Sequence, residues 1–259
     1  MLIENTLFGI EDKVAIALDM LRTFEPPEGY YVAYSGGKDS TVILDLVRRS
    51  GVKYDAHYNR TTVDPPELVR FVRSQPDVIE NHPEMSMWDL IIKKRQPPTR
   101  RARYCCETLK ERGGTGRLII TGVRADESVK RSKRRQIESC FKDGTKSYLH
   151  IIFHWSTEEV WEYIHNRKLP YCSLYDEGFE RLGCICCPMG GPKKQLIEAE
   201  RYPKYKALYI KAFQRMLDKK IADGLDCGKW KSGEDVWNWW TTEKEKEPDC
   251  EGQVYMFDD

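Results

Sequence analysis

The stretch Tyr30-Tyr-Val-Ala-Tyr-Ser-Gly-Gly-Lys-Asp-Ser-Thr41 decides the fold. Its start, Tyr30 to Tyr34, predicts a short buried strand, and residues 41–49 predict a helix. The two glycines between them predict a tight turn whose backbone can approach a ligand closely. Because the next N–H groups open a helix N-terminus, a phosphate group binds there favourably. This order of strand, turn and helix therefore predicts a nucleotide-phosphate site.

Side chains around the turn suit an anionic ligand. Lys38 adds a positive charge, and Ser35, Ser40 and Thr41 supply hydroxyl groups. Neither G-x-x-x-x-G-K nor G-x-G-x-x-G is present, so this is not one of the two common nucleotide loops. The alternative is a plain turn followed by a helix cap. The strand before the glycines and the helix after them favour the ligand site.

Strands and helices alternate through most of the chain. Apolar residues at helical spacing fill residues 11–24, and a capping box at Ser156–Glu159 opens another helix. Pro65 and Pro66 precede a predicted helix at residues 67–73, and further strands are predicted at 54–58, 117–121 and 148–153. This alternation predicts an α/β fold with a mostly parallel, Rossmann-like sheet and helices on both faces.

The character of the chain changes after Pro170. A loop rich in Gly, Cys and Pro extends to Pro192, and an apolar stripe from Tyr205 to Leu217 predicts a long helix. The tryptophans that follow favour core or docking positions, with base stacking as the alternative. We therefore predict an α/β domain at residues 1–190, which includes the paired cysteines, and a helical C-terminal extension at 191–259.

Composition narrows the class of protein. The 259 residues carry 42 Lys+Arg and 41 Asp+Glu with 11% aromatics, which indicates a folded chain rather than a disordered one. No apolar run approaches the ~18 residues that a membrane span needs. The first residues lack the basic and apolar regions of a signal peptide. Together with cysteines that cluster in adjacent pairs, these features predict a cytoplasmic protein without a disulfide framework.

Four of the nine cysteines form two pairs. Cys105 and Cys106 are adjacent, and Cys184 and Cys187 form a C-x-x-C pair, so the pairs can converge on one four-thiolate site. Four thiolates suit zinc or an iron–sulfur cluster. Adjacent cysteines are unusual for structural zinc, which favours the cluster, with zinc and unliganded thiols as alternatives. Cys186 is surplus: it replaces a ligand, accepts sulfur, or has no role.

Basic residues concentrate in two runs. Lys93–Arg103 contains six bases and no acid, and Arg124–Arg135 contains six more with two acids, whereas the tail Glu243–Asp259 is acidic. Basic runs are often only solvated surface. Two of them beside the motifs favour an anionic substrate, and both can contact a nucleic-acid backbone without sequence preference.

Several motifs resemble one family. Ser35–Ser40 resembles the pyrophosphate loop of the adenine nucleotide α-hydrolase superfamily. Gly122-Val-Arg-Ala-Asp-Glu-Ser128, followed by Arg131, is similar to the G-x-R-x-x-E-S segment of the phosphoadenosine phosphosulfate reductase family. The segments at 169–171, 174–178 and 182–184 resemble that family as well. The resemblance extends over about residues 30–189.

The resemblance implies roles for particular residues. It places the loop, Gly122, Arg124 and Arg131 around the nucleotide phosphates, with the catalytic candidates Lys38, Asp39 and Arg124; the loop residues are Ser35, Gly36, Gly37, Lys38, Asp39, Ser40 and Thr41. Asp39 either helps to position Mg²⁺, if ATP is the substrate, or caps the helix. The family's iron–sulfur branch has the cysteine order C-C…C-x-x-C, which implies a [4Fe–4S] cluster on Cys105, Cys106, Cys184 and Cys187.

Two enzymatic hypotheses follow from the resemblance. In the favoured one, ATP is cleaved to AMP and pyrophosphate to activate DNA or tRNA for sulfur insertion, with sulfur from a donor such as a cysteine desulfurase. This is the chemistry of the DNA phosphorothioation ATP pyrophosphatases and of the tRNA thiolases. In the other, a thiol reductant drives reduction of phosphoadenosine phosphosulfate or adenosine phosphosulfate to sulfite.

The reductase hypothesis needs a nucleophilic cysteine. The family's reductases carry it in a C-terminal E-C-G-[IL]-H motif, which this chain lacks; Cys227 and Cys250 are the nearest candidates. A third hypothesis is a nucleotide- or cluster-sensing protein without turnover. The sequence leaves the sulfur donor, the acceptor and the oligomeric state open.

Overall fold

The computed structural model describes residues 1–7, 9–140 and 144–242. The acidic tail Glu243–Asp259, with Cys250, lies outside the described residues. The chain divides into two compact units: the first is Met1–Arg60, Pro65–His82 and Arg112–Gly183, and the second is Thr61–Asp64, Pro83–Glu111 and Cys184–Asp259. The first therefore lacks both cysteine pairs, unlike the predicted domain 1–190, and that domain boundary stays a prediction.

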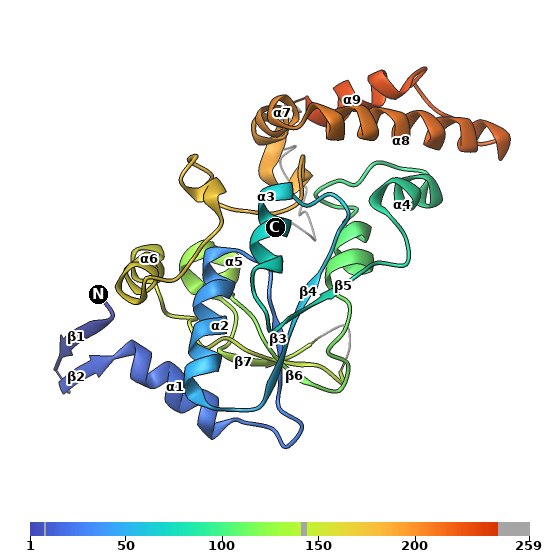
Figure 1. The fold of residues 1–259 in the computed structure, drawn as a ribbon. Helices are drawn as coiled ribbons and strands as arrows, with labels where there is room; N and C mark the ends of the chain where they lie inside the picture. Colours follow the sequence, from blue (N-terminus) through green and yellow to red (C-terminus); the bar gives the residue numbers. More distant parts are fainter. Residues whose placement is uncertain (8, 141–143, 243–259) are drawn as a thin grey trace, which may run out of the picture. The chain divides into compact units, whose positions relative to one another are not determined.

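A six-stranded sheet forms the centre of the first unit (Figure 1). Its strand order is β5-β4-β3-β6-β8-β7, and every neighbouring pair is parallel except β7 with β8. The strands are β3 (Tyr30–Ala33), β4 (Tyr54–Asn59), β5 (Val78–Asn81), β6 (Leu118–Ile120), β7 (Ile137–Ser139) and β8 (Ser147–Leu149). The predicted α/β fold with a mostly parallel sheet is confirmed.

The central strand β3 marks a reversal in the strand order. From β3 the chain passes through α2 (Lys38–Ser50) to β4 on one side, while β6 pairs with β3 on the other side. In open α/β sheets, ligands bind outside the carboxyl ends of the strands at such a point. The loops that follow β3 and β6 are therefore the expected walls of a ligand site.

Helices pack against this sheet and share one hydrophobic core with it. Side chains of α1 (Lys13–Thr23), α2, α3 (Pro66–Arg73) and α6 (Thr157–Arg167) join one core with Tyr30 and Val32 of β3. At the start of α6, Ser156 accepts a hydrogen bond from the Glu159 N–H, which confirms the predicted capping box. The smaller elements are β1 (Ile3–Thr6), β2 (Gly9–Asp12) and α5 (Val129–Ser132).

The predicted strand 148–153 is wrong beyond Leu149. There the backbone turns: the Phe153 N–H donates to the His150 carbonyl, and the Trp155 N–H donates to the Ile152 carbonyl. Ile151 and Ile152 are buried all the same. A buried apolar turn has the same sequence pattern as a buried strand, so the pattern could not separate them.

The second unit is built from helices around an aromatic core. They are α4 (Met87–Lys94), a π-helical turn at Cys106–Lys110, α7 (Gly191–Arg201), α8 (Pro203–Ala222) and α9 (Gly233–Thr241). Tyr209 of α8 packs on Trp240 of α9, with ring centroids 4.9 Å apart. Trp237 and Trp240 are buried, so the predicted core role of these tryptophans is confirmed. None of the helices in the described ranges combines the length and the apolar character that crossing a bilayer requires.

Candidate functional site

The glycine turn has the predicted place between β3 and α2. Gly36 lies in the left-handed region, with φ +74°. A Cβ added there would come within 2.7 Å of both Leu68 Cδ1 and Val72 Cγ2 of α3. Conformation and close packing therefore both require glycine at this position.

We expect Gly36→Ala to be more destabilising than Gly51→Ala. Gly51 also has a left-handed backbone, φ +78°, but a Cβ there would meet no described atom within 4 Å. Both variants incur about 1–2 kcal/mol of backbone strain. Only Gly36→Ala adds a clash, of about 1–3 kcal/mol. Urea unfolding of the two variants measures the difference, and equal losses of stability would show that α3 does not restrict the turn.

Hydroxyl groups of the loop bond to the loop itself. The Ser40 and Thr41 hydroxyls donate to the Gly37 carbonyl over 2.9 and 3.1 Å, and the Ser35 and Ser40 hydroxyls lie 3.1 Å apart. Ser40 and Thr41 are buried. These residues shape the turn, and their contact with a nucleotide stays a prediction.

Tyr175 is part of this site, although the sequence analysis did not select it. Its hydroxyl accepts a hydrogen bond of 2.8 Å from the Lys38 N–H, at the N-terminus of α2. A polar group therefore lies where helix N-termini bind anions. Burial raises the pKa of the Tyr175 phenol, so the group is neutral. Tyr175 lies in the segment 174–178, which the sequence analysis used only as evidence of family resemblance.

Asp39 is held between two cations. Its Oδ1 accepts a 2.6 Å hydrogen bond from Arg124 Nε, and its Oδ2 lies 3.3 Å from Lys38 Nζ. Arg124 is only 1% exposed, and its other donors bond the Trp155 carbonyl and the Thr157 hydroxyl. Arg124 thus fixes Asp39 at the start of α2. Direct contact of Arg124 with phosphates, and of Asp39 with Mg²⁺, stay predictions.

The loop after β6 passes directly against the start of α2. A Cβ on Gly122 would lie 2.9 Å from Asp39 Cβ, so a larger residue would push the two loops apart. The structure therefore brings Gly122 and Arg124 to the phosphate loop, as the strand order requires. Arg131 instead forms an ion pair with Glu127 of its own segment, and its role toward a nucleotide stays a prediction.

The four paired cysteines line one pocket in the second unit. Cys105 and Cys106 come from the start of the π-helical turn, where the Glu111 N–H donates to the Cys106 carbonyl. Single π turns are rare and occur often at functional sites. The pocket is lined by Thr61, Met87, Pro98, Cys105, Cys106, Leu109, Lys110, Cys184, Cys187, Pro188 and Tyr209. The two cysteine pairs therefore converge, as their spacing suggested.

Positive groups accompany these thiols. Arg103 Nη2 lies 3.8 Å from Cys106 Sγ, and Lys110 lines the pocket. A hydrogen bond from Cys105, followed by one from Arg103, lowers the pKa of the Cys106 thiol. Burial raises the pKa of Cys184 to about 11, and the nearby charge of Lys110 partly offsets that rise. The pocket thus favours negative charge at Cys106 in particular.

Cys186 is buried but does not line the pocket. Its thiol lies 3.5 Å from the Gln195 carbonyl as a donor, and its N–H donates to Glu198 Oε2 over 2.6 Å. Gln195 Nε2 in turn donates to the Cys186 carbonyl over 3.1 Å. Two α7 side chains that the sequence analysis missed therefore hold the Cys184–Cys187 loop, and the Cys186 thiol faces the Gln195 carbonyl.

The cysteine pocket differs from a site for a single metal ion. Across the described ranges, no group of three or more His, Cys, Asp or Glu side chains is arranged to hold a metal ion. A four-iron cluster does not need all its ligands at one ion, because each thiolate binds its own iron. Four thiols around one pocket fit that chemistry.

Comparison with known proteins gives the family. The family model described as "Phosphoadenosine phosphosulfate reductase domain" matches residues 29–189, which include the phosphate loop, Arg124 and all four pocket-lining cysteines. The chain belongs to the phosphoadenosine phosphosulfate reductase family.

Several curated proteins are similar to this chain in sequence. An adenosine 5'-phosphosulfate reductase of Geobacillus sp. is 30% identical over 211 residues, covering 71% of this chain and 84% of the relative. That of Geobacillus kaustophilus is 29% identical over 207 residues, with the same coverage. An uncharacterized protein of Methanocaldococcus jannaschii is 31% identical over 175 residues, but the match covers only 35% of that protein.

A solved structure shows the same fold. The phosphoadenylyl-sulfate reductase from Candida auris, in complex with phosphate, superposes with a TM-score of 0.52 at 19% identity, covering 65% of this chain and 87% of that one. At this identity the likeness concerns the fold alone. It supports the predicted α/β fold with a mostly parallel sheet.

Proposed function

We propose that this protein cleaves ATP between its α- and β-phosphates. The observation that carries the proposal is the loop at the reversal of strand order, where Gly36, Lys38 and the start of α2 meet the loop that holds Arg124. Helix N-terminal N–H groups and Lys38 suit the pyrophosphate that leaves. Asp39, held by Lys38 and Arg124, is the carboxylate available for Mg²⁺.

The reaction activates an oxygen of a second molecule. That oxygen attacks the α-phosphorus, the bond to the bridging oxygen breaks, and pyrophosphate leaves with the electron pair. The acceptor now carries AMP. The terminal sulfur of a donor persulfide, such as that of a cysteine desulfurase, attacks the activated atom, and AMP leaves with the electron pair. A thiol reductant then cleaves the remaining S–S bond, which leaves one sulfur on the acceptor and releases the donor as a thiol. We propose a nucleic acid, DNA or tRNA, as the acceptor, because two basic runs can contact its phosphates.

We propose that Cys105, Cys106, Cys184 and Cys187 hold a [4Fe–4S] cluster, with zinc as the alternative occupant. A bound cluster supplies redox chemistry or a sulfur-binding iron. Arg103 and Lys110 offset the negative charge of the thiolates. We propose a cytoplasmic location, because cysteines that cluster as metal ligands suit a compartment where disulfides are rare.

A second candidate is reduction of adenosine phosphosulfate or phosphoadenosine phosphosulfate to sulfite. The relatives named adenosine 5'-phosphosulfate reductase favour it. This chemistry needs a thiol that attacks the sulfonyl sulfur and a thiol reductant that releases sulfite. Cys227 is half-buried, with its thiol 3.9 Å from the Leu217 carbonyl, and Cys250 lies outside the described residues. A protein that binds nucleotide or cluster without turnover is the third candidate.

One experiment separates the candidates. Protein purified without oxygen is assayed for iron and sulfide, then incubated with ATP, with and without tRNA or duplex DNA, and separately with either sulfonucleotide and a thiol. We expect AMP and pyrophosphate from ATP, at a rate that nucleic acid raises. Sulfite from a sulfonucleotide, without pyrophosphate from ATP, would establish the reductase instead, and no product from any substrate would establish the binding protein.

A further inference from the structure

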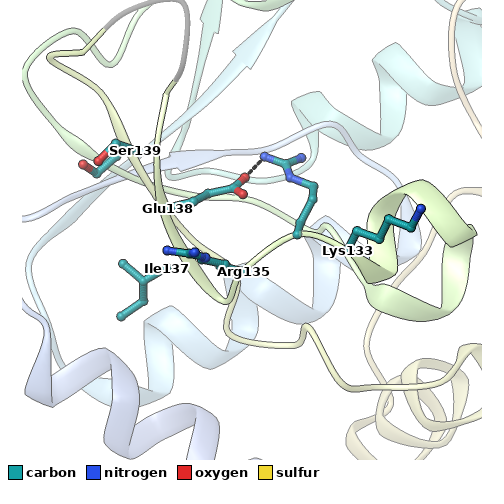
Figure 2. Close-up of a pocket in the computed structure, with 7 residues that line it drawn as sticks. Lys133, Arg135, Ile137, Glu138 and Ser139 are labelled. Atoms are coloured by element: carbon teal, nitrogen blue, oxygen red, sulfur yellow. Dashed lines mark hydrogen bonds and ion pairs between the residues drawn. The ribbon is translucent and has the colours of Figure 1, made fainter. Parts of the chain in front are cut away.

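A basic pocket lies at the β7 edge of the sheet, in the first unit (Figure 2). It has a volume of ≈ 580 Å³ and opens widely to solvent, so it has room for more than one phosphate group. Its lining consists of Lys133, Arg134, Arg135, Ile137, Glu138, Ser139 and Ser147. None of these residues belongs to the phosphate loop or to the loop after β6.

The single carboxylate of this lining is already engaged. Glu138 forms an ion pair with Arg134, drawn as a dashed line in Figure 2, and it also accepts a hydrogen bond of 3.3 Å from His150. Arg134 is further held over the ring of Tyr148, with its guanidinium carbon 6.0 Å from the ring centroid. One cation is therefore fixed in the pocket wall.

Two other cations of the lining have no such partner. Lys133 and Arg135 are exposed, and within the described part of the chain neither forms an ion pair. Three cations against one carboxylate give the pocket a net positive charge. The hydroxyls of Ser139 and Ser147 add neutral donors to the same lining.

We propose that this pocket binds the phosphodiester backbone of the nucleic-acid acceptor. An open, positively charged hollow with hydroxyl donors suits a polymer with a phosphate at every step, whereas a small ligand is normally enclosed. The pocket lies at a sheet edge and shares no residue with the nucleotide site, so the two ligands can bind together. This inference rests on the proposed function, because it identifies how that function's acceptor is held.

The test is a double variant, Lys133→Ala with Arg135→Ala. Binding of fluorescein-labelled tRNA and of a labelled DNA duplex is followed by fluorescence anisotropy from low to physiological salt. We expect affinity for the preferred nucleic acid to fall about tenfold, and the slope of log K against log salt to fall by about 2, one unit for each lost phosphate contact.

The matched control is Lys53→Ala with Lys168→Asn. Both lysines are exposed in the same unit, and asparagine tolerates the left-handed backbone of Lys168. The control removes the same charge at positions that do not line the pocket. It is therefore expected to change the slope of log K against log salt by less than half as much. Equal effects of the two double variants, or wild-type protein that binds neither nucleic acid, would overturn the proposal.

Turnover of ATP without nucleic acid, in which water attacks the α-phosphorus in place of the acceptor oxygen, distinguishes this inference from the proposed function. Lys133 and Arg135 lie outside the nucleotide site, so their double variant is expected to keep the basal rate of AMP formation. Basal AMP formation with unchanged nucleic-acid binding would overturn the inference alone. Selective loss of binding by a protein that forms no AMP would support the pocket and contradict the ATP reaction.

Discussion

Protein carrying Cys184→Ala is expected to lose its cluster, whereas protein carrying Cys186→Ala is expected to keep it. Cys184 lines the four-thiol pocket, and Cys186 is turned toward Gln195 and Glu198 of α7. With a [4Fe–4S] cluster, wild-type protein purified without oxygen contains about four iron and four sulfide per chain. We expect Cys184→Ala to retain less than about one tenth of that iron, since one iron loses its ligand.

Both cysteines are buried and two residues apart, so each variant controls for the other. Iron and sulfide assays, with the visible absorption spectrum, provide the measurement. Stoichiometric zinc without iron in wild-type protein would show that the pocket holds zinc instead of an iron–sulfur cluster. Equal iron in the two variants would contradict the assignment of the pocket.

Replacing Arg124 by methionine is expected to destabilise the protein by about 3–5 kcal/mol, because breaking a buried ion pair is strongly destabilising. Asp39 keeps only Lys38 as a cationic partner, and the Trp155 carbonyl and the Thr157 hydroxyl lose their hydrogen bonds from Arg124. Arg124 is 1% exposed and bonds Asp39 over 2.6 Å. The free energy of unfolding in urea measures the effect. The matched control is Asp126→Asn, because Asp126 also pairs with Arg124, over 3.3 Å, but its side chain is 50% exposed. We expect that control to cost less than about 1 kcal/mol.

A double-mutant cycle locates the effect. If the Arg124–Asp39 pair is the cause, adding Asp39→Asn to Arg124→Met is expected to recover part of the lost stability, because the carboxylate that has lost its Arg124 partner is replaced by a neutral amide. Additive losses from the two substitutions would show that Arg124 acts through Trp155 and Thr157 rather than through Asp39.

The phosphate loop was predictable because its signal is local. Strand, glycine turn and helix start follow one another within residues 30–41, and Gly36 has the left-handed conformation that only glycine adopts readily. The sequence showed only that the two cysteine pairs can converge, because spacing indicates which residues can be ligands and not where they lie in the fold. The roles of the individual loop residues, Gly122, Arg124 and Arg131 were predicted from the family resemblance.

Other features depend on contacts between distant segments. That Arg124 is buried against Asp39 follows from the pairing of β3 with β6, which no local pattern encodes. The orientation of Cys186 follows from α7, whose Gln195 and Glu198 resemble ordinary polar positions of a surface helix. The turn after Leu149 was missed because its residues are apolar. They are apolar because they are buried, and a buried strand would have the same composition.

Competitive binding of labelled ATP tests most directly whether the glycine loop holds nucleotide phosphates. Equilibrium dialysis is carried out with wild-type protein and with Lys38→Ala, each in the presence of inorganic pyrophosphate or of adenosine. We predict that pyrophosphate displaces ATP from the wild-type protein and that Lys38→Ala weakens ATP binding at least about tenfold, because a charge-assisted contact to phosphate is lost. ATP binding that neither pyrophosphate nor the substitution changes would contradict the assignment of this loop.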